Sequence, residues 1–120
     1  MIYHELTMEQ PDPPLAPAAF LILFALASGD KHGYAIMQEA RKLSDHSFQM
    51  GPATLYTTIQ RLLDADRIRE VPGPDHGDSR RKYYRLTGAG RSTLNAELAR
   101  MESMVKKSKA MRLRTAESSS

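Results

Sequence analysis

The chain has 120 residues, of which 41% are hydrophobic and 26% charged, and its formal net charge is +3. This length fits one domain with a modest core, and the composition is that of an ordinary globular protein. The sequence has no cysteine, which excludes disulfide bonds, thiolate metal sites and cysteine nucleophiles and fits a reducing compartment.

Residues 1–16 contain three prolines and are expected to form an N-terminal arm, because proline prevents a continuous helix there. Residues 17–27 then predict a helix that is apolar on all sides and therefore central in the domain. Its hydrophobic run has about half of the ~20 residues that span a bilayer, and no basic secretion signal precedes it. We therefore expect a cytoplasmic protein with no membrane partner.

A second helix is expected after Asp30, which can cap it, with Ile36 and Leu43 on the inward side. Lys31 and His32 would then lie at its first turn, where free backbone N–H groups can hold a phosphate. For His32, a packing or surface role is the alternative.

The stretch from Gly51 to Asp66 predicts a third helix, with Gly51 as N-cap and Pro52 at the first helical position. Its apolar residues recur at helical spacing and form one stripe, consisting of Leu55, Ile59, Leu62 and Leu63. The opposite face is small, polar and rich in hydroxyl groups, and consists of Ala53, Thr54, Thr57, Gln60, Arg61 and Asp64. Short threonine side chains allow close approach and can donate to phosphates or bases. Taken alone, the stretch also fits an ordinary amphipathic surface helix.

A change to period-two patterning after Asp66 predicts a β-hairpin. A short strand containing Ile68 and Val71 leads into a loop rich in proline and glycine, and a second strand follows from Arg80 to Leu86. The basic residues of this second strand, which flank two tyrosines, are Arg80, Arg81, Lys82 and Arg85. A basic hairpin after a hydroxyl-rich helix is typical of nucleic-acid binding, and a solvated strand edge that prevents aggregation is the alternative.

No catalytic residue, metal site or cofactor is expected, so the protein is not predicted to be an enzyme. Asp45 and His46 resemble part of a catalytic pair but have no nucleophile with them. Asp75, His76 and Asp78 could bind a metal, but the glycine and proline around them favour a mobile loop tip.

Thr87 is expected to cap a long final helix over residues 88–114, followed by a disordered tail at 115–120. Its apolar residues are spaced as in the seam between two packed helices, and they are Leu94, Leu98, Met101 and Val105. Because a small domain has little room to bury this stripe, we expect it to form the interface of a homodimer.

The order of three helices, a basic hairpin and a long helix is that of a winged helix-turn-helix followed by a dimerisation helix. The fold class is therefore mainly α with a small β-hairpin (α+β), with the winged helix domain over residues 17–87. Here the sequence resembles the PadR-like transcriptional regulators. The resemblance is carried by His32-Gly33-Tyr34, by Gly51-Pro52-Ala53-Thr54-Leu55-Tyr56, by Ile59, Arg61, Leu62 and Ile68, by Arg81 through Thr87, and by Gly90-Arg91.

The resemblance implies a homodimeric repressor that binds a double-stranded DNA operator, with the third helix in the major groove and the wing on the DNA backbone or in the minor groove. Residues expected at base edges are Thr54, Thr57 and Arg61, and those expected at phosphates are Lys31, Tyr56, Arg80, Arg81 and Lys82. The resemblance also allows a small-molecule effector. A winged helix that binds another protein without reading DNA is the alternative function.

The sequence departs from the family pattern at the end of the third helix. The family usually has glycine and an apolar residue there, whereas this chain has Asp66 and Arg67. Aspartate tolerates the left-handed C-cap conformation less well than glycine, so a somewhat strained turn is expected. Arg67 adds a charge near the base of the wing, from which it is expected to approach DNA.

Overall fold

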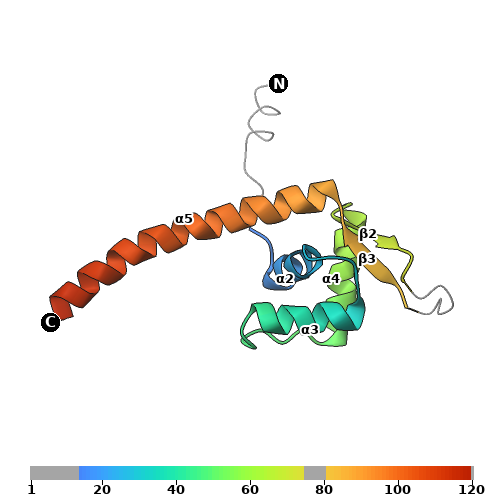
Figure 1. Cartoon of the computed structure of the whole chain (residues 1–120), viewed down its shortest axis with the longest axis horizontal. Helices are drawn as coiled ribbons and strands as arrows, with labels where there is room; N and C mark the ends of the chain where they lie inside the picture. Colours follow the sequence, from blue (N-terminus) through green and yellow to red (C-terminus); the bar gives the residue numbers. More distant parts are fainter. Residues whose placement is uncertain (1–13, 75–80, 120) are drawn as a thin grey trace, which may run out of the picture.

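The structure, a computed structural model, describes residues 14–74 and 81–119, with side chains described up to residue 112. In Figure 1 the other helices and a small sheet lie beneath one end of the long C-terminal helix. In chain order the elements are α2 (Pro17–Leu26), β1 (Lys31–His32), α3 (Gly33–Leu43), α4 (Pro52–Asp64), β2 (Ile68–Val71), β3 (Tyr83–Leu86) and α5 (Gly88–Ser119). The predicted class, mainly α with a small hairpin and a long final helix, is confirmed. Most of the predicted arm, the loop candidates for metal binding, Arg80 and residue 120 lie outside the described residues.

Helix α2 is the centre of the hydrophobic core. It contacts α3, α4, α5 and β3, which explains why its sequence is apolar on every side. Pro17 occupies its first turn, where a missing backbone N–H is not needed. Its fully buried side chains include Ile22 and Leu23, which pack with Ile36 of α3 and Leu55 of α4 in one cluster. No helix in the described ranges is both long and apolar enough to cross a bilayer.

The start of α3 differs from the prediction. The N-cap is His32, whose Nδ1 accepts a hydrogen bond from the Ala35 backbone N–H at 3.3 Å, so the prediction of Asp30 as cap was wrong. Asp30 instead pairs with Arg85, and Lys31–His32 form the short strand β1. A two-residue strand leaves no periodic pattern in a sequence, which is why it was not predicted.

Asp45 and His46, the residues that resembled a catalytic fragment, lie just past the end of helix α3. Both have left-handed backbones, with φ of 52° and 63°. The backbone N–H of His46 donates to the Arg41 carbonyl at 2.7 Å, and that of Asp45 donates to the Lys42 carbonyl at 3.1 Å. This bonding is the Schellman pattern, so the pair terminates a helix.

The sheet is antiparallel with strand order β1–β3–β2. Ile68 is paired with Leu86, and Glu70 with Tyr84, so these residues project from the same face of the sheet. Ile68, Tyr84 and Leu86 are buried, which confirms the predicted alternation of β3. The strand begins at Tyr83, so the predicted start at Arg80 was too early.

Helix α4 follows the prediction closely. Gly51 is its N-cap, Pro52 begins it, and Leu55, Ile59 and Leu62 are buried. Asp66, just past its end, has a left-handed φ of 58°, as expected for a residue in place of glycine. The Asp66 N–H donates to the Leu63 carbonyl at 3.0 Å and the Arg67 N–H to the Leu62 carbonyl at 2.9 Å, a second Schellman ending.

Thr87 joins the end of α4 to the start of α5. Its hydroxyl donates to the Asp66 carbonyl at 2.7 Å and accepts from the Gly90 N–H at 3.0 Å, which confirms it as the cap of α5. Its own N–H donates to the Arg67 carbonyl at 3.1 Å. A Cβ at Gly90 would lie 1.9 Å from that carbonyl oxygen, so only glycine fits where α5 passes the base of the wing.

The first turns of α5 belong to the core of the protomer. Leu94 is 2% exposed in the single chain, and Leu98 packs against the same cluster. The prediction of Leu94 as a dimer-interface residue was therefore wrong, because its surface is already covered. Farther along, Val105 is 47% exposed. The helix continues to Ser119, so the predicted disordered tail from residue 115 is helical through Ser119.

The start of α2 is attached to α5 through Glu97. This carboxylate is 5% exposed, accepts the Leu15 backbone N–H at 3.2 Å, and forms an ion pair with Arg100. A buried carboxylate needs such partners, because an isolated buried charge is very costly. The contact fixes where the chain enters the core.

We expect Gly90→Ala to destabilise the fold by about 1–3 kcal/mol or more, because the new methyl group collides with backbone that cannot move without displacing α5. Gly88→Ala is the matched control, since a Cβ there meets nothing within 4 Å. Urea unfolding followed by circular dichroism measures both. Equal stability of the two variants would contradict the close approach at Gly90.

Candidate nucleic-acid interface

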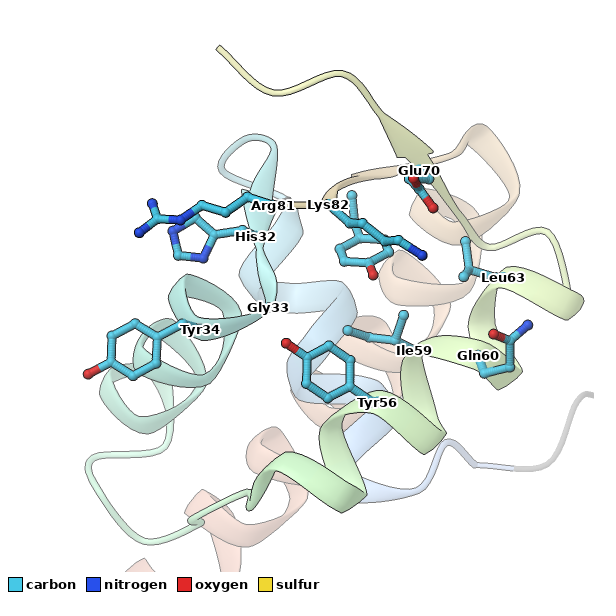
Figure 2. A pocket seen from close by; sticks show the side chains of 11 residues that line it. His32, Gly33, Tyr34, Tyr56, Ile59, Gln60, Leu63, Glu70, Arg81 and Lys82 are labelled. Atoms are coloured by element: carbon cyan, nitrogen blue, oxygen red, sulfur yellow. The ribbon is translucent and has the colours of Figure 1, made fainter. Parts of the chain in front are cut away.

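A groove of about 630 Å³ lies where α4 meets the sheet. Figure 2 shows side chains reaching it from the start of α3, from one side of α4 and from the wing. The residues that line it are His32, Gly33, Tyr34, Tyr56, Ile59, Gln60, Leu63, Glu70, Arg81, Lys82 and Tyr84. The groove thus combines aromatic, amide and charged groups contributed by three separate elements.

Tyr56 has a fixed place in this groove because Gly33 leaves room for its ring. A Cβ at Gly33 would lie 2.7 Å from the Tyr56 hydroxyl oxygen and 3.1 Å from the ring carbon that bears it. The ring therefore passes directly over the first residue of α3, and its side chain remains 53% exposed. A phenol in this position can donate a hydrogen bond to an anion above the groove.

The wing contributes Arg81 and Lys82, both exposed, to the same groove. The structure thus brings together three of the predicted phosphate contacts, namely these two and Tyr56. It also places Tyr84 at the base of the groove, where burial raises the pKa of its phenol and the negative charge of Glu70 adds to that rise.

The predicted base-reading residues Thr54, Thr57 and Arg61 are exposed on α4 but do not line the groove. They lie on the solvent-facing side of the helix, as its periodicity predicted. On the same side, Gln60 donates from its amide to the Asp64 carboxylate at 2.9 Å. The polar surface of α4 therefore extends beyond the groove along the whole helix.

Two predicted cationic contacts are used inside the protein. The Lys31 ammonium donates to the Ala25 carbonyl and the Ser28 hydroxyl, both at 2.7 Å, so it caps the end of α2 and is directed away from the groove. Arg67 donates to the Thr93 hydroxyl of α5. The expectation that Arg67 approaches DNA was wrong, because its guanidinium group is directed toward α5.

The outer face of the sheet contains a bidentate ion pair between Arg85 and Asp30. The guanidinium nitrogens donate to the two carboxylate oxygens at 3.0 and 2.8 Å. This hydrogen bonding holds the pKa of the Asp30 carboxyl below its usual value.

His32 packs edge-to-face on Tyr83, with ring centroids 5.4 Å apart. The packing role considered for His32 is thus confirmed.

Gln60 and Glu70 line the groove but were not among the predicted contacts. For Glu70 a signal existed, because it lies two residues after the buried Ile68 and must project from the same face of the strand. Applying the period-two pattern to β2 as well as β3 would have placed its carboxylate over α4. Gln60 was on the predicted polar face, and its position in the groove depends on how the wing packs.

The polar face of α4, the basic wing beside it and the helical core that supports both define a winged helix-turn-helix protein. The family model described as the transcriptional regulator PadR-like family matches residues 22–96. The chain belongs to this family, whose members are transcriptional regulators rather than enzymes.

Two curated proteins are similar to this chain in sequence. An uncharacterised protein of Lysinibacillus sphaericus is 37% identical over 75 residues, which are 62% of this chain and 69% of that protein. A transcriptional regulator of Mycobacterium tuberculosis is 33% identical over 85 residues, covering 71% of this chain and 76% of the regulator.

Solved structures share the fold. A transcriptional regulator from Clostridium thermocellum has a TM-score of 0.64 and 28% identity, covering 78% of this chain and 87% of that one. Bacillus subtilis PadR in complex with operator DNA has a TM-score of 0.62 and 22% identity, covering 72% of this chain and 48% of that one. Because this chain and Bacillus subtilis PadR are only 22% identical, their similarity shows a shared fold alone.

We expect Asp30→Asn to cause a small loss of stability at neutral pH, because an exposed ion pair contributes little. The pKa of Asp30 is depressed in the folded state, so its contribution is present above the ordinary value of 3.8 and is lost as the pH falls through the depressed value. Urea unfolding of both proteins across an acid titration measures this. If the difference in unfolding free energy between the two proteins stayed constant into strong acid, the ion pair could not be its cause.

Proposed function

We propose that the protein is a sequence-specific, homodimeric DNA-binding repressor of transcription that acts in the cytoplasm. The observation that carries the proposal is the continuity of the exposed polar face of α4 with a groove lined by Tyr56, Arg81 and Lys82. A helix with small polar side chains can enter the major groove, while adjacent cations neutralise phosphates. The fold is shared with Bacillus subtilis PadR, which was solved in complex with operator DNA, and this supports duplex DNA as the partner.

In the proposed complex, Thr54, Thr57 and Arg61 face base edges. Each good contact of this kind contributes about 1–3 kcal/mol of discrimination between bases. Tyr56, Arg81 and Lys82 contact phosphates, and Arg80 belongs to the same set by its place in the sequence. Lys31 is left out, because its ammonium group is bonded to the end of α2.

The proposed dimer forms through the part of α5 beyond Leu98, which Figure 1 shows extending past α2 and α3. Met104 is 57% exposed, Val105 47% and Met111 62%, and Met101 is half-buried. Met104 and Val105 follow Met101 by three and four residues, and Met111 follows Met104 by seven, so these residues lie on one side of the helix. A twofold axis through this stripe would bury it against its own copy and give two α4 helices for two half-sites.

The proposal includes release from DNA by a small-molecule effector. Its support is a cavity of about 240 Å³ between the start of α2, the base of the wing and α5, lined in part by Arg67, Thr93 and Glu97. A molecule bound there would touch both the DNA-binding part and the helix proposed to dimerise.

We expect the double variant Arg81→Ala/Lys82→Ala to bind all duplex DNA about a hundredfold more weakly near 0.1 M salt, because each phosphate contact contributes about tenfold there. The slope of log affinity against log salt should also become shallower by about 1.8. Fluorescence anisotropy at several salt concentrations measures both quantities. Lys42→Ala, at an exposed site on α3, controls for loss of charge alone.

An unchanged salt slope in the double variant would contradict the role of the wing. If the wild-type protein bound no duplex from a random library even at low salt, the DNA-binding function would be wrong. The alternative, a module that binds another protein, would then replace it.

We expect Val105→Asp to shift the monomer–dimer equilibrium toward monomer by about a hundredfold or more, because the twofold axis would bury two charges in an apolar seam. Ser103→Asp introduces the same charge at an exposed position on the opposite side of α5 and should leave the dimer intact. Sedimentation equilibrium distinguishes the two variants. Equal dissociation, or a wild-type protein that is monomeric at high concentration, would contradict this interface.

A further inference from the structure

The groove between α4 and the wing has one acidic residue, Glu70, in its lining. The cationic residues of the lining are Arg81 and Lys82, and the other lining residues are apolar, aromatic, amide or histidine residues. Figure 2 shows the Glu70 side chain pointing from β2 toward α4, where Leu63 and Gln60 lie. A carboxylate at this point is unexpected in a surface that attracts phosphates.

No cation within the described ranges pairs with this carboxylate. The ion pairs found there join Asp30 to Arg85 and Glu97 to Arg100. The charge of Glu70 acts on Tyr84, whose pKa it raises in addition to the effect of burial. A negative charge in a basic groove lowers the sequence-independent affinity for the DNA backbone. Such affinity therefore does not explain why a glutamate occupies this position.

The backbone of the wing fixes the side from which Glu70 projects. Glu70 is paired with Tyr84 across the two strands, and Ile68, two residues earlier on the same face, is buried. A slip of one residue would expose Ile68, so the register that places Glu70 over α4 is held by the core. The carboxylate is thereby held in the groove that Gln60 also lines.

We propose that Glu70 is a specificity-determining residue, which repels phosphate from the part of the groove where β2 faces α4 and accepts a hydrogen bond from an exocyclic amino group of a base. The inference rests on the proposed DNA-binding function and assigns a role within the same surface. A carboxylate accepts hydrogen bonds and cannot donate them, and base amino groups are its natural partners in DNA. Registers that place a phosphate against Glu70, rather than at Tyr56, Arg81 and Lys82, are penalised, and specificity arises from that difference in affinity.

The test compares Glu70→Gln and Glu70→Ala with the wild-type protein. The probes are a duplex selected by the wild-type protein from a random library and a scrambled duplex of equal length. We expect both variants to bind the scrambled duplex about tenfold more tightly, because one repulsive charge is removed. Glutamine keeps an acceptor oxygen, so Glu70→Gln should retain the selected duplex within a few fold. Glu70→Ala should also lose about tenfold on the selected duplex, because no acceptor remains.

Glu102→Gln, at an exposed site on α5, makes the same change in net charge away from the groove. It should leave the ratio of the two affinities unchanged. The role of Glu70 would be overturned if Glu70→Gln had the same ratio of selected to scrambled affinity as the wild-type protein. It would also be overturned if Glu102→Gln changed the two affinities by the same factors as Glu70→Gln. In either case the DNA-binding function itself would still stand. If the wild-type protein selected no duplex, the proposed function and this inference would both fail.

Discussion

The geometry of the molecule depends on the junction at which the end of α4 is bonded to the start of α5. Asp66 and Arg67, just past α4, offer their carbonyl groups to Thr87, and Thr87 in turn caps α5. Gly90 allows the long helix to pass in contact with that turn. Because α4 carries the polar face and α5 the exposed apolar stripe, these few bonds fix the angle between the two. A change in that angle would move every contact made by either helix.

The basic residues of the chain have different tasks although they look alike in the sequence. Lys31 caps α2, Arg67 is bonded to α5, and Arg85 is paired with Asp30. These cations hold the sheet and the helices in place. Arg81 and Lys82, which line the groove, have no such partner in the part of the chain that the structure describes. The positive charge available to DNA is therefore smaller and more localised than the composition suggests.

The sequence predicted those elements whose pattern is local and repeated. The stripe and caps of α4, the central position of α2 and the alternation of β3 all follow from spacing, and the structure confirms them. Strand β1 was missed because two residues form no period. The hydrogen bonds of Lys31 and the burial of Leu94 could not be predicted from spacing, since each depends on a neighbouring element. Periodicity tells which side of a helix is apolar, but not whether the same chain or a second copy buries it.

The apolar stripe of α5 passes from the inside of the protomer to its outside along a single helix. Leu94 and Leu98 complete the core, whereas Val105 and Met111 are exposed to solvent in the single chain. In the proposed dimer, folding and assembly would be separable, because the core cluster is made of residues of one chain. For a regulator that assembles through this stripe, the amount of assembled protein at low concentration rises with the square of the protomer concentration. Operator occupancy would then respond to the level of expression more steeply than that of a monomeric binder.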